Sequence, residues 1–245
     1  MVTKKEEIQV RKDRVLGVTV EEYIHSVTPV SSSYITEHHF FDLSSATIRN
    51  ILAELEEDGF LTHPHTSAGR VPTQKGYRYY VDYLMDQIQI LENEKAEIKA
   101  QYEAQTQELE DLLDQTSKIL SDSTHYTSIV SVDGWDRKLY CCGTNFVVQY
   151  PEYQDLKKIQ DILYALDEKE KLLKVINREL LKRINVFIGS EIKLKEVESC
   201  SMVVTQYKTH HGTSGRIAVL GPTRMDYERV VSTLNYVTNL LEECY

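Results

Sequence analysis

Two short segments of the sequence hold side chains whose types and spacing suit the recognition of DNA. The first reads Leu43-Ser44-Ser45-Ala46-Thr47-Ile48-Arg49-Asn50, with hydroxyl groups ahead of a guanidinium and an amide. The paired groups of arginine match the edge of guanine, and those of asparagine match adenine. We therefore expect Arg49 and Asn50 to contact bases. Hydroxyl groups at the start of a helix suit phosphates, and phosphate contacts are expected from Ser44, Ser45 and Thr47.

The second segment lies downstream and reads Pro64-His65-Thr66-Ser67-Ala68-Gly69-Arg70-Val71-Pro72-Thr73. Extended segments flank its small residues, and this pattern is typical of a β-hairpin. A hairpin beside a groove-binding helix indicates a wing, which would add donors and positive charge on the same side. The further DNA contacts expected from the wing and the helix after it are His65, Thr66, Arg70, Lys75 and Arg78. Each of these residues alone is ordinary on a surface, and a three-helix bundle with hydroxyl caps is the alternative.

Hydrophobic spacing indicates which elements would position these groups. Apolar residues recur at helical intervals over 8–27, and Pro29 disfavours helix at the residue before it. A short helix over 31–38 and a turn follow. The third helix begins at one of the two serines named above, either of which can cap it, and ends at Gly59. Thr73 can cap a fourth helix after the hairpin.

The third helix has two contrasting faces. One is small, polar or basic at its N-terminal end and acidic at its C-terminal end, where Glu54 and Glu57 lie. A helix that enters the major groove by its N-terminal end has this polarity, because phosphates repel the carboxylates. The opposite face is apolar and would pack on the first two helices through Ile48, Ile51, Leu52 and Leu55.

Downstream of this region the sequence predicts one long helix and then a mixed domain. Residues 91–120 contain neither Gly nor Pro, and apolar residues recur there at seven-residue spacing, so we expect a single helix that can pair with a second copy. Near the C-terminus, Thr223 and Asp226 resemble a capping box at the start of the last helix. The other expected elements are strands over 128–132, 139–142, 186–188, 201–207 and 216–220 and helices over 156–166 and 169–182.

The composition is that of a globular protein, with 245 residues, 41% of them hydrophobic and 27% charged. A net charge of −10 argues against nonspecific coating of nucleic acid. Residues 1–83 hold nine Lys and Arg against twelve Asp and Glu, so DNA binding would depend on a local face. No apolar run is long enough to span a membrane and the N-terminus has no apolar signal core, so we expect a cytoplasmic protein without membrane contact.

The sequence gives no pattern for catalysis, a metal or a cofactor. Cys141, Cys142, Cys200 and Cys244 have neither zinc-ligand spacing nor the arrangement of a disulfide framework. Phosphate-loop and nucleophile–base motifs are also missing. We therefore expect a regulator rather than an enzyme, with no catalytic residue, no metal site and no cofactor.

Several motifs together resemble those of the HrcA family of bacterial heat-inducible transcription repressors. In the N-terminal part these are the two segments above, Lys75-Gly76-Tyr77-Arg78, and Pro29-Val30-Ser31-Ser32, where Ser31 replaces a family glycine. In the C-terminal half they are Gly143-Thr144-Asn145, Pro151-Glu152-Tyr153, Ile188-Gly189-Ser190-Glu191 and Gly221-Pro222-Thr223-Arg224-Met225-Asp226-Tyr227. Motifs of this length in this order are specific, and they span nearly the whole chain.

The resemblance implies a functional dimer that binds an inverted-repeat operator, called CIRCE, upstream of chaperone operons. It implies that the GroE chaperonin promotes the active repressor, and that heat relieves repression by diverting the chaperonin to unfolded clients. The family usually carries an inserted helical region that contributes to dimerisation, but the stretch from Leu120 to Gly143 is too short to hold it. The dimer contact is then expected from the helix over 91–120 or from the C-terminal domain.

The expected fold is α+β in three parts. Residues 1–86 would form a winged helix-turn-helix DNA-binding domain and 87–122 a long connecting helix, while by resemblance 123–245 would form a GAF-like mixed α/β domain. The leading interpretation is a homodimeric repressor of heat-shock genes that binds double-stranded operator DNA. Two alternatives remain open. One is a ligand-sensing regulator gated by the GAF-like domain, and the other is a winged-helix protein-interaction module without DNA binding, which the acidic first domain keeps open.

Overall fold

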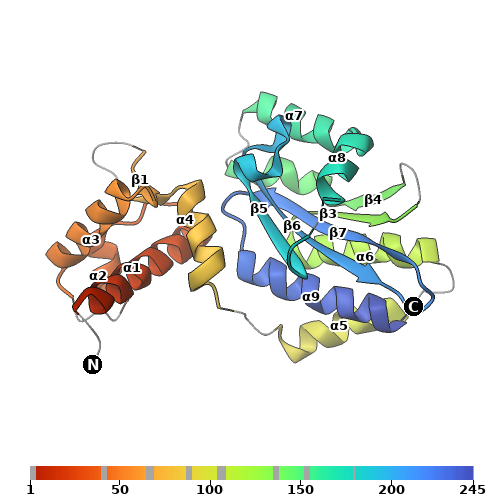
Figure 1. The fold of residues 1–245 in the computed structure, drawn as a ribbon, viewed down its shortest axis with the longest axis horizontal. Helices are drawn as coiled ribbons and strands as arrows, with labels where there is room; N and C mark the ends of the chain where they lie inside the picture. The colour runs from red at the N-terminus through yellow and green to blue at the C-terminus, as the bar shows by residue number, and fades with distance from the viewer. Residues whose placement is uncertain are drawn as a thin grey trace. The chain divides into compact units, whose positions relative to one another are not determined.

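A computed structural model describes residues 4–39, 43–64, 69–86, 90–103, 109–134, 138–151, 155–178 and 180–244 (Figure 1). The chain divides into two compact units, Met1–Asp86 and Gln87–Tyr245. It is a mixed α/β protein whose strands pair antiparallel in both units. Within the described ranges, the helices are too short or too polar to cross a bilayer.

The N-terminal unit consists of helices and a short hairpin (Figure 1). In chain order its elements are α1 (Lys4–Ser26), α2 (Ser32–His38), α3 (Ser45–Glu57), β1 (Leu61–Thr62), β2 (Val71–Pro72) and α4 (Gln74–Tyr79), which continues as a π-helical turn, η1 (Tyr80–Leu84). β1 and β2 pair antiparallel. Val30, which precedes α2, forms a further antiparallel bridge with Arg70.

The apolar stripe of α3 forms much of the core of this unit. The four residues predicted to face inward, Ile48, Ile51, Leu52 and Leu55, are all buried. They belong to a helix that packs on both α1 and α2. The Ser44 side chain caps α3 by accepting the N–H of Thr47 at 3.2 Å, and Gly59 follows the helix with a φ of 77°. The predicted start and end of this helix are therefore confirmed, and its opposite face is left to solvent.

The C-terminal unit is built on a sheet with the strand order β4-β3-β7-β6-β5 (Figure 1). Its strands are β3 (Thr127–Val132), β4 (Leu139–Cys142), β5 (Ile184–Ile188), β6 (Cys200–Lys208) and β7 (Ser214–Pro222). Its helices are α5 (Glu92–Glu103), α6 (Leu109–Thr124), α7 (Leu156–Asp167), α8 (Lys169–Ile176) and α9 (Tyr227–Cys244), with 3-10 turns η2 (Thr144–Gln149), η4 (Gly189–Ile192) and η5 (Lys195–Val197). All five predicted strand segments lie within these strands.

Helices cover the sheet on both faces. α6 and α9 pack against β3, β4 and β6 and against each other. On the other side, α7 and α8 close over a buried apolar cluster with the strands, to which Ile162, Leu172 and Ile176 contribute from the helices and Met202 and Leu220 from the sheet. The mixed α/β character predicted for this half is thus confirmed.

The prediction of a single helix over 91–120 is wrong. The described residues form two helices, α5 and α6, that fold back on each other, and the Gln115 side chain donates to the carbonyl of Gln101. In a straight helix these two residues would lie about 21 Å apart. α5 also contacts α9, where the guanidinium of Arg229 lies 3.0 Å from the Glu94 carboxylate. Folding back buries Ile98 inside the unit, so at this position the seven-residue spacing serves an internal contact.

Two smaller predictions also need correction. α8 ends at Ile176 rather than 182, because Arg178 turns away to donate to the carbonyls of Glu191 and Ile192. The start of α9 is capped by Asp226 alone, whose carboxylate accepts the N–H of Arg229 at 3.0 Å. Asp226 therefore stands at the cap position itself, and not three residues after a capping threonine.

Candidate nucleic-acid interface

The N-terminal half of α3 presents two side chains that have no partner among the described residues. Arg49 and Asn50 are both exposed. Neither forms a hydrogen bond or an ion pair with any residue that the structure describes. Their donors and acceptors are free to pair with another molecule, and both lie within the first two turns of a capped helix. This pair matches the expected base-reading residues.

The predicted hydroxyl residues have structural roles at the same helix start. Ser44 is exposed and caps α3, and its hydroxyl also lies 2.9 Å from that of Thr47. Ser45 donates to the hydroxyl of Ser32 at 3.3 Å, which links α3 to the start of α2. A hydroxyl accepts and donates at once, so these contacts leave room for a phosphate oxygen beside Ser44.

The predicted cations near the hairpin are engaged within the unit. Arg70 pairs with the carboxylate of Glu56, its Nε lying 2.8 Å from Oε2. The Lys75 ammonium donates to the carbonyl of Asp58 at 2.6 Å. Arg78 lies 3.4 Å from Asp82. The structure does not bring these cations to α3 as free charges, and their DNA contacts stay predictions; His65 and Thr66 lie outside the described residues.

The acidic end of α3 is largely neutralised by neighbouring cations. Lys12 on α1 lies 2.9 Å from Glu54 and 3.2 Å from Asp58. The hydrogen bond with Glu54 raises the pKa of Lys12 above its ordinary value. Glu56 is paired with Arg70 and His63, which leaves Glu57 as an exposed carboxylate of α3 without a partner among the described residues. The charge balance of the sequence therefore overstates how strongly this helix would repel DNA.

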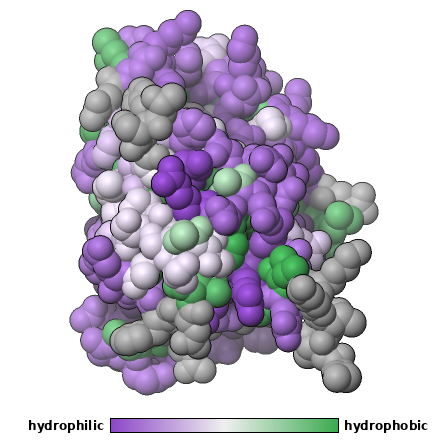
Figure 2. Space-filling model, turned by 90° about the vertical axis from the view of Figure 1, so that its left-hand side faces the viewer, coloured by the Kyte–Doolittle hydropathy of each residue, from purple (hydrophilic) through white to green (hydrophobic). Residues whose placement is uncertain are grey.

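The surface on this side of the molecule is mainly hydrophilic. Figure 2 shows polar side chains over most of the visible face, with apolar ones in small groups between them. Among the described residues of the N-terminal unit, the large apolar ones that are exposed are Ile8, Val10, Tyr34 and Tyr83.

Lys75 gives a test of whether its role is structural. Its ammonium holds the carbonyl of Asp58, at the end of α3, and lies 4.4 Å from the centre of the Phe60 ring. Lys75→Ala should therefore lower the free energy of unfolding by about 1 kcal/mol. Urea denaturation followed by circular dichroism measures this. Unchanged stability together with weaker DNA binding would instead make Lys75 a phosphate contact.

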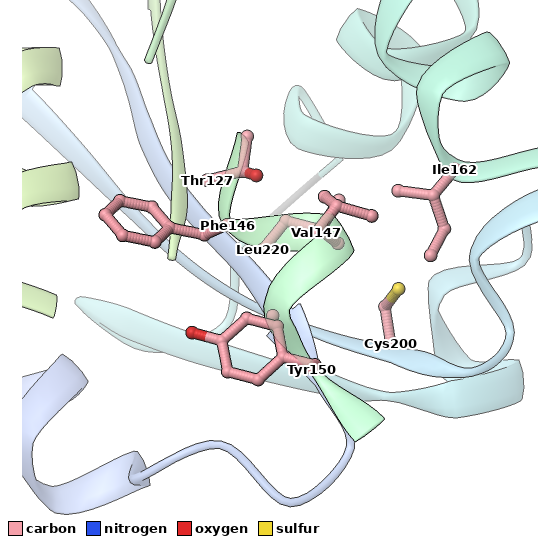
Figure 3. A pocket seen from close by; sticks show the side chains of 8 residues that line it. Thr127, Phe146, Val147, Tyr150, Ile162, Cys200 and Leu220 are labelled. Carbon is pink, nitrogen blue, oxygen red and sulfur yellow. The ribbon is translucent and has the colours of Figure 1, made fainter. Parts of the chain in front are cut away.

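The C-terminal unit contains a small pocket beneath η2 (Figure 3). Val147, Tyr150, Ile162, Cys200 and Leu220 are among the residues that line it. Its volume of about 10 Å³ is enough for roughly one water molecule. Small-molecule sites are usually of about 300 Å³ or more, so this pocket gives no support to a ligand-sensing role. Among the described residues there is also no cluster of His, Cys, Asp and Glu that could hold a metal ion.

Comparisons with known proteins agree with the motifs. A family profile described as "HrcA protein C terminal domain" matches residues 131–231. The heat-inducible transcription repressor HrcA of Carboxydothermus hydrogenoformans is 28% identical over 334 aligned positions, covering 96% of this chain and 98% of the relative. That of Symbiobacterium thermophilum is 27% identical over 332 positions, covering 95% and 97%. A crystal structure of a hypothetical protein shares the fold, with a TM-score of 0.74 and 20% identity over 95% of this chain and 97% of its own.

These relatives are named as bacterial transcription repressors. The chain is similar to proteins of the HrcA family over nearly its whole length, and the profile of that family's C-terminal domain matches residues 131–231. Because 245 residues cannot fill 334 aligned positions, at least 89 positions of the first relative have no counterpart here. α6 leads directly into β3, which pairs with β4, so the stretch from Leu120 to Gly143 is already occupied by the sheet unit. The chain is therefore shorter than the relatives it resembles.

Proposed function

We propose that this protein represses heat-shock chaperone genes, and that Met1–Asp86 is a winged-helix domain that binds double-stranded operator DNA. The observation that carries the proposal is the pair Arg49 and Asn50, which are exposed in the first two turns of α3 and have no partner in the described part of the chain. Side chains of these types can discriminate guanine and adenine in the major groove. Similarity to HrcA, which is named as a heat-inducible transcription repressor, supports the assignment to heat-shock genes.

The proposed operator is an inverted repeat of the CIRCE type, bound by a homodimer. A two-fold symmetric site is matched by a two-fold symmetric protein, with one α3 helix in each half-site. We assign the dimer contact to the C-terminal unit, proposed to be GAF-like, with the α5–α6 hairpin as one of its available surfaces. Without the inserted region of the longer relatives, this unit is the part of the chain left to supply that contact.

The proposed partners beyond DNA rest on the resemblance to HrcA repressors. The GroE chaperonin would promote the active repressor, and heat would relieve repression by occupying the chaperonin with unfolded proteins. The protein would act in the cytoplasm, where the bacterial chromosome lies, and would carry out no catalysis. The similar proteins are named as repressors and not as enzymes, which supports this last point.

The test is a gel shift on a CIRCE-type inverted repeat and on a scrambled duplex of the same composition, across salt concentrations. The plot of log affinity against log salt should have a slope of about −4 to −6, because each released phosphate counterion contributes about −0.9. A slope steeper than this is not expected, since Arg70, Lys75 and Arg78 already have partners. Equal binding to both duplexes at every salt concentration would contradict the proposal.

A further inference from the structure

One carboxylate, that of Glu56 in the last turn of α3, contacts both sides of the hairpin. Its Oε2 lies 2.8 Å from the Nε of Arg70, the residue before β2. That Nε makes no well-aligned hydrogen bond within the described residues, so the contact is an ion pair. The other oxygen, Oε1, contacts the Nδ1 of His63, the residue after β1. The segment between the two strands therefore starts and ends beside a single α3 side chain, which is itself only 25% exposed.

The strands of the hairpin do little by themselves to fix its direction. Each is two residues long, and one of the paired residues is Pro72, which has no N–H to donate. An isolated two-stranded hairpin is marginally stable in water. The Val30–Arg70 bridge, with N–O distances of 2.9 and 2.8 Å, ties the hairpin to the chain before α2. Glu56 adds the link to the helix that carries Arg49 and Asn50.

We propose that Glu56 is a positioning residue for operator recognition, which orients the hairpin relative to α3, and that Arg70 acts through Glu56 rather than through a phosphate. The inference rests on the proposed function, because it concerns how that DNA surface keeps its shape. It has a distinctive electrostatic consequence. Neutralising a carboxylate near DNA normally strengthens binding, since phosphates repel it. At Glu56 the same change should weaken binding, because it releases both His63 and Arg70.

Glu57 provides a matched control in the same helical turn. It is exposed and has no hydrogen bond or ion pair with the described residues. Glu57→Gln removes the same charge without altering a hairpin contact. In the full-length protein, Glu56→Gln should weaken binding to the inverted repeat about five- to tenfold, as loss of a charge-assisted contact does. Glu57→Gln should strengthen it about twofold, by removing one repulsion.

Amide hydrogen exchange without DNA supplies a second readout. The N–H groups of Val30 and Arg70 form the bridge at the base of the hairpin, and the amide of Leu52 lies in the buried part of α3. In Glu56→Gln, exchange at Val30 and Arg70 should rise about fivefold while Leu52 stays unchanged. Glu57→Gln should leave all three as they are. Equal acceleration at Leu52 would overturn the proposal, because it would report general destabilisation rather than loss of a local contact.

The same variants separate failure of this inference from failure of the proposed function. If the unsubstituted protein does not prefer the inverted repeat, the proposed function fails, whereas faster exchange at the bridge would still support the role of Glu56 in holding the hairpin. If the unsubstituted protein does prefer the repeat, and Glu56→Gln binds as well as Glu57→Gln, the positioning role is wrong.

A double variant tests the role assigned to Arg70. If Arg70 acts through Glu56, Arg70→Gln should weaken binding no more than Glu56→Gln does, because the contact of Glu56 with His63 remains. The double variant should bind no more weakly than Glu56→Gln, since the contact of Arg70 with Glu56 is already lost there. If Arg70 instead contacts a DNA phosphate, a different result is expected. The double variant would then bind more weakly than either single variant, with a shallower salt dependence. That result would overturn the assignment.

Discussion

An Arg49→Ala protein is expected to lose most of its ability to distinguish the inverted repeat from scrambled DNA. A well-aligned pairing of arginine with guanine contributes about 1–3 kcal/mol of discrimination, and a dimer would lose two such contacts. The expected loss is therefore about 2–6 kcal/mol in affinity for the operator, or about 30-fold at the least. Because Arg49 has no partner among the described residues, its removal should leave the free energy of unfolding unchanged. Fluorescence anisotropy with the two duplexes measures the difference.

Two further variants show whether the loss comes from geometry or from charge. Arg49→Lys keeps the charge but not the planar pair of donors, so it should retain nonspecific binding and lose discrimination. Arg11 on α1 is also exposed and unpartnered among the described residues. Arg11→Ala should therefore weaken binding to both duplexes slightly and equally. If Arg49→Ala still discriminates between them, Arg49 does not read a base.

Gly143→Ala is expected to destabilise the C-terminal unit strongly. Gly143 has a φ of +82°, in the left-handed region that side chains disfavour, and precedes the turn η2. An added Cβ would lie 2.0 Å from the hydroxyl of Ser121 and 2.5 Å from the carbonyl of Tyr126. The backbone strain costs about 1–2 kcal/mol and overpacking about 1–3, so a loss of about 3 kcal/mol is expected. Thermal and urea denaturation, followed by circular dichroism, measure it.

A substitution at Gly134 separates the effect of backbone strain from that of overpacking. Its φ is +81°, nearly the same as that of Gly143, but nothing lies within 4 Å of an added Cβ. Gly134→Ala should therefore cost only the backbone term, about 1–2 kcal/mol. If both variants lose the same stability, the close approach of the added Cβ to Ser121 and Tyr126 does not contribute to the loss at Gly143.

Local signals in the sequence were enough to predict the elements that carry the candidate site. The start of α3 was predictable because a serine cap and an apolar stripe both depend on neighbours within a few residues. The strands of the C-terminal unit were predictable for the same reason. Arg49 and Asn50 were predictable as surface residues because the apolar stripe fixes which face of α3 points inward. Their DNA contacts remain a prediction.

Contacts between distant residues were not predictable in this way. Seven-residue spacing over 91–120 does not reveal whether the apolar stripe meets another helix of the same chain or of a second copy, and here α5 meets α6 and α9. The sequence predicts a DNA contact for Arg70, because nothing in it shows that this side chain pairs with Glu56. No pattern in the sequence singles out Glu56 among the acidic residues at the end of α3. Only the folded backbone brings its carboxylate between the two strands.

The strand order of the C-terminal sheet has a consequence for folding during synthesis. β7 lies between β3 and β6, and residues paired across β3 and β7, such as Ser131 and Arg216, are 85 positions apart in the chain. β3 leaves the ribosome long before its central partner exists, and α9 comes later still. The N-terminal unit is compact within the first 86 residues and can fold early. For a protein proposed to depend on a chaperonin, the interval in which β3 is paired with β4 but not yet with β7 leaves one edge of this apolar strand open to capture or to aggregation.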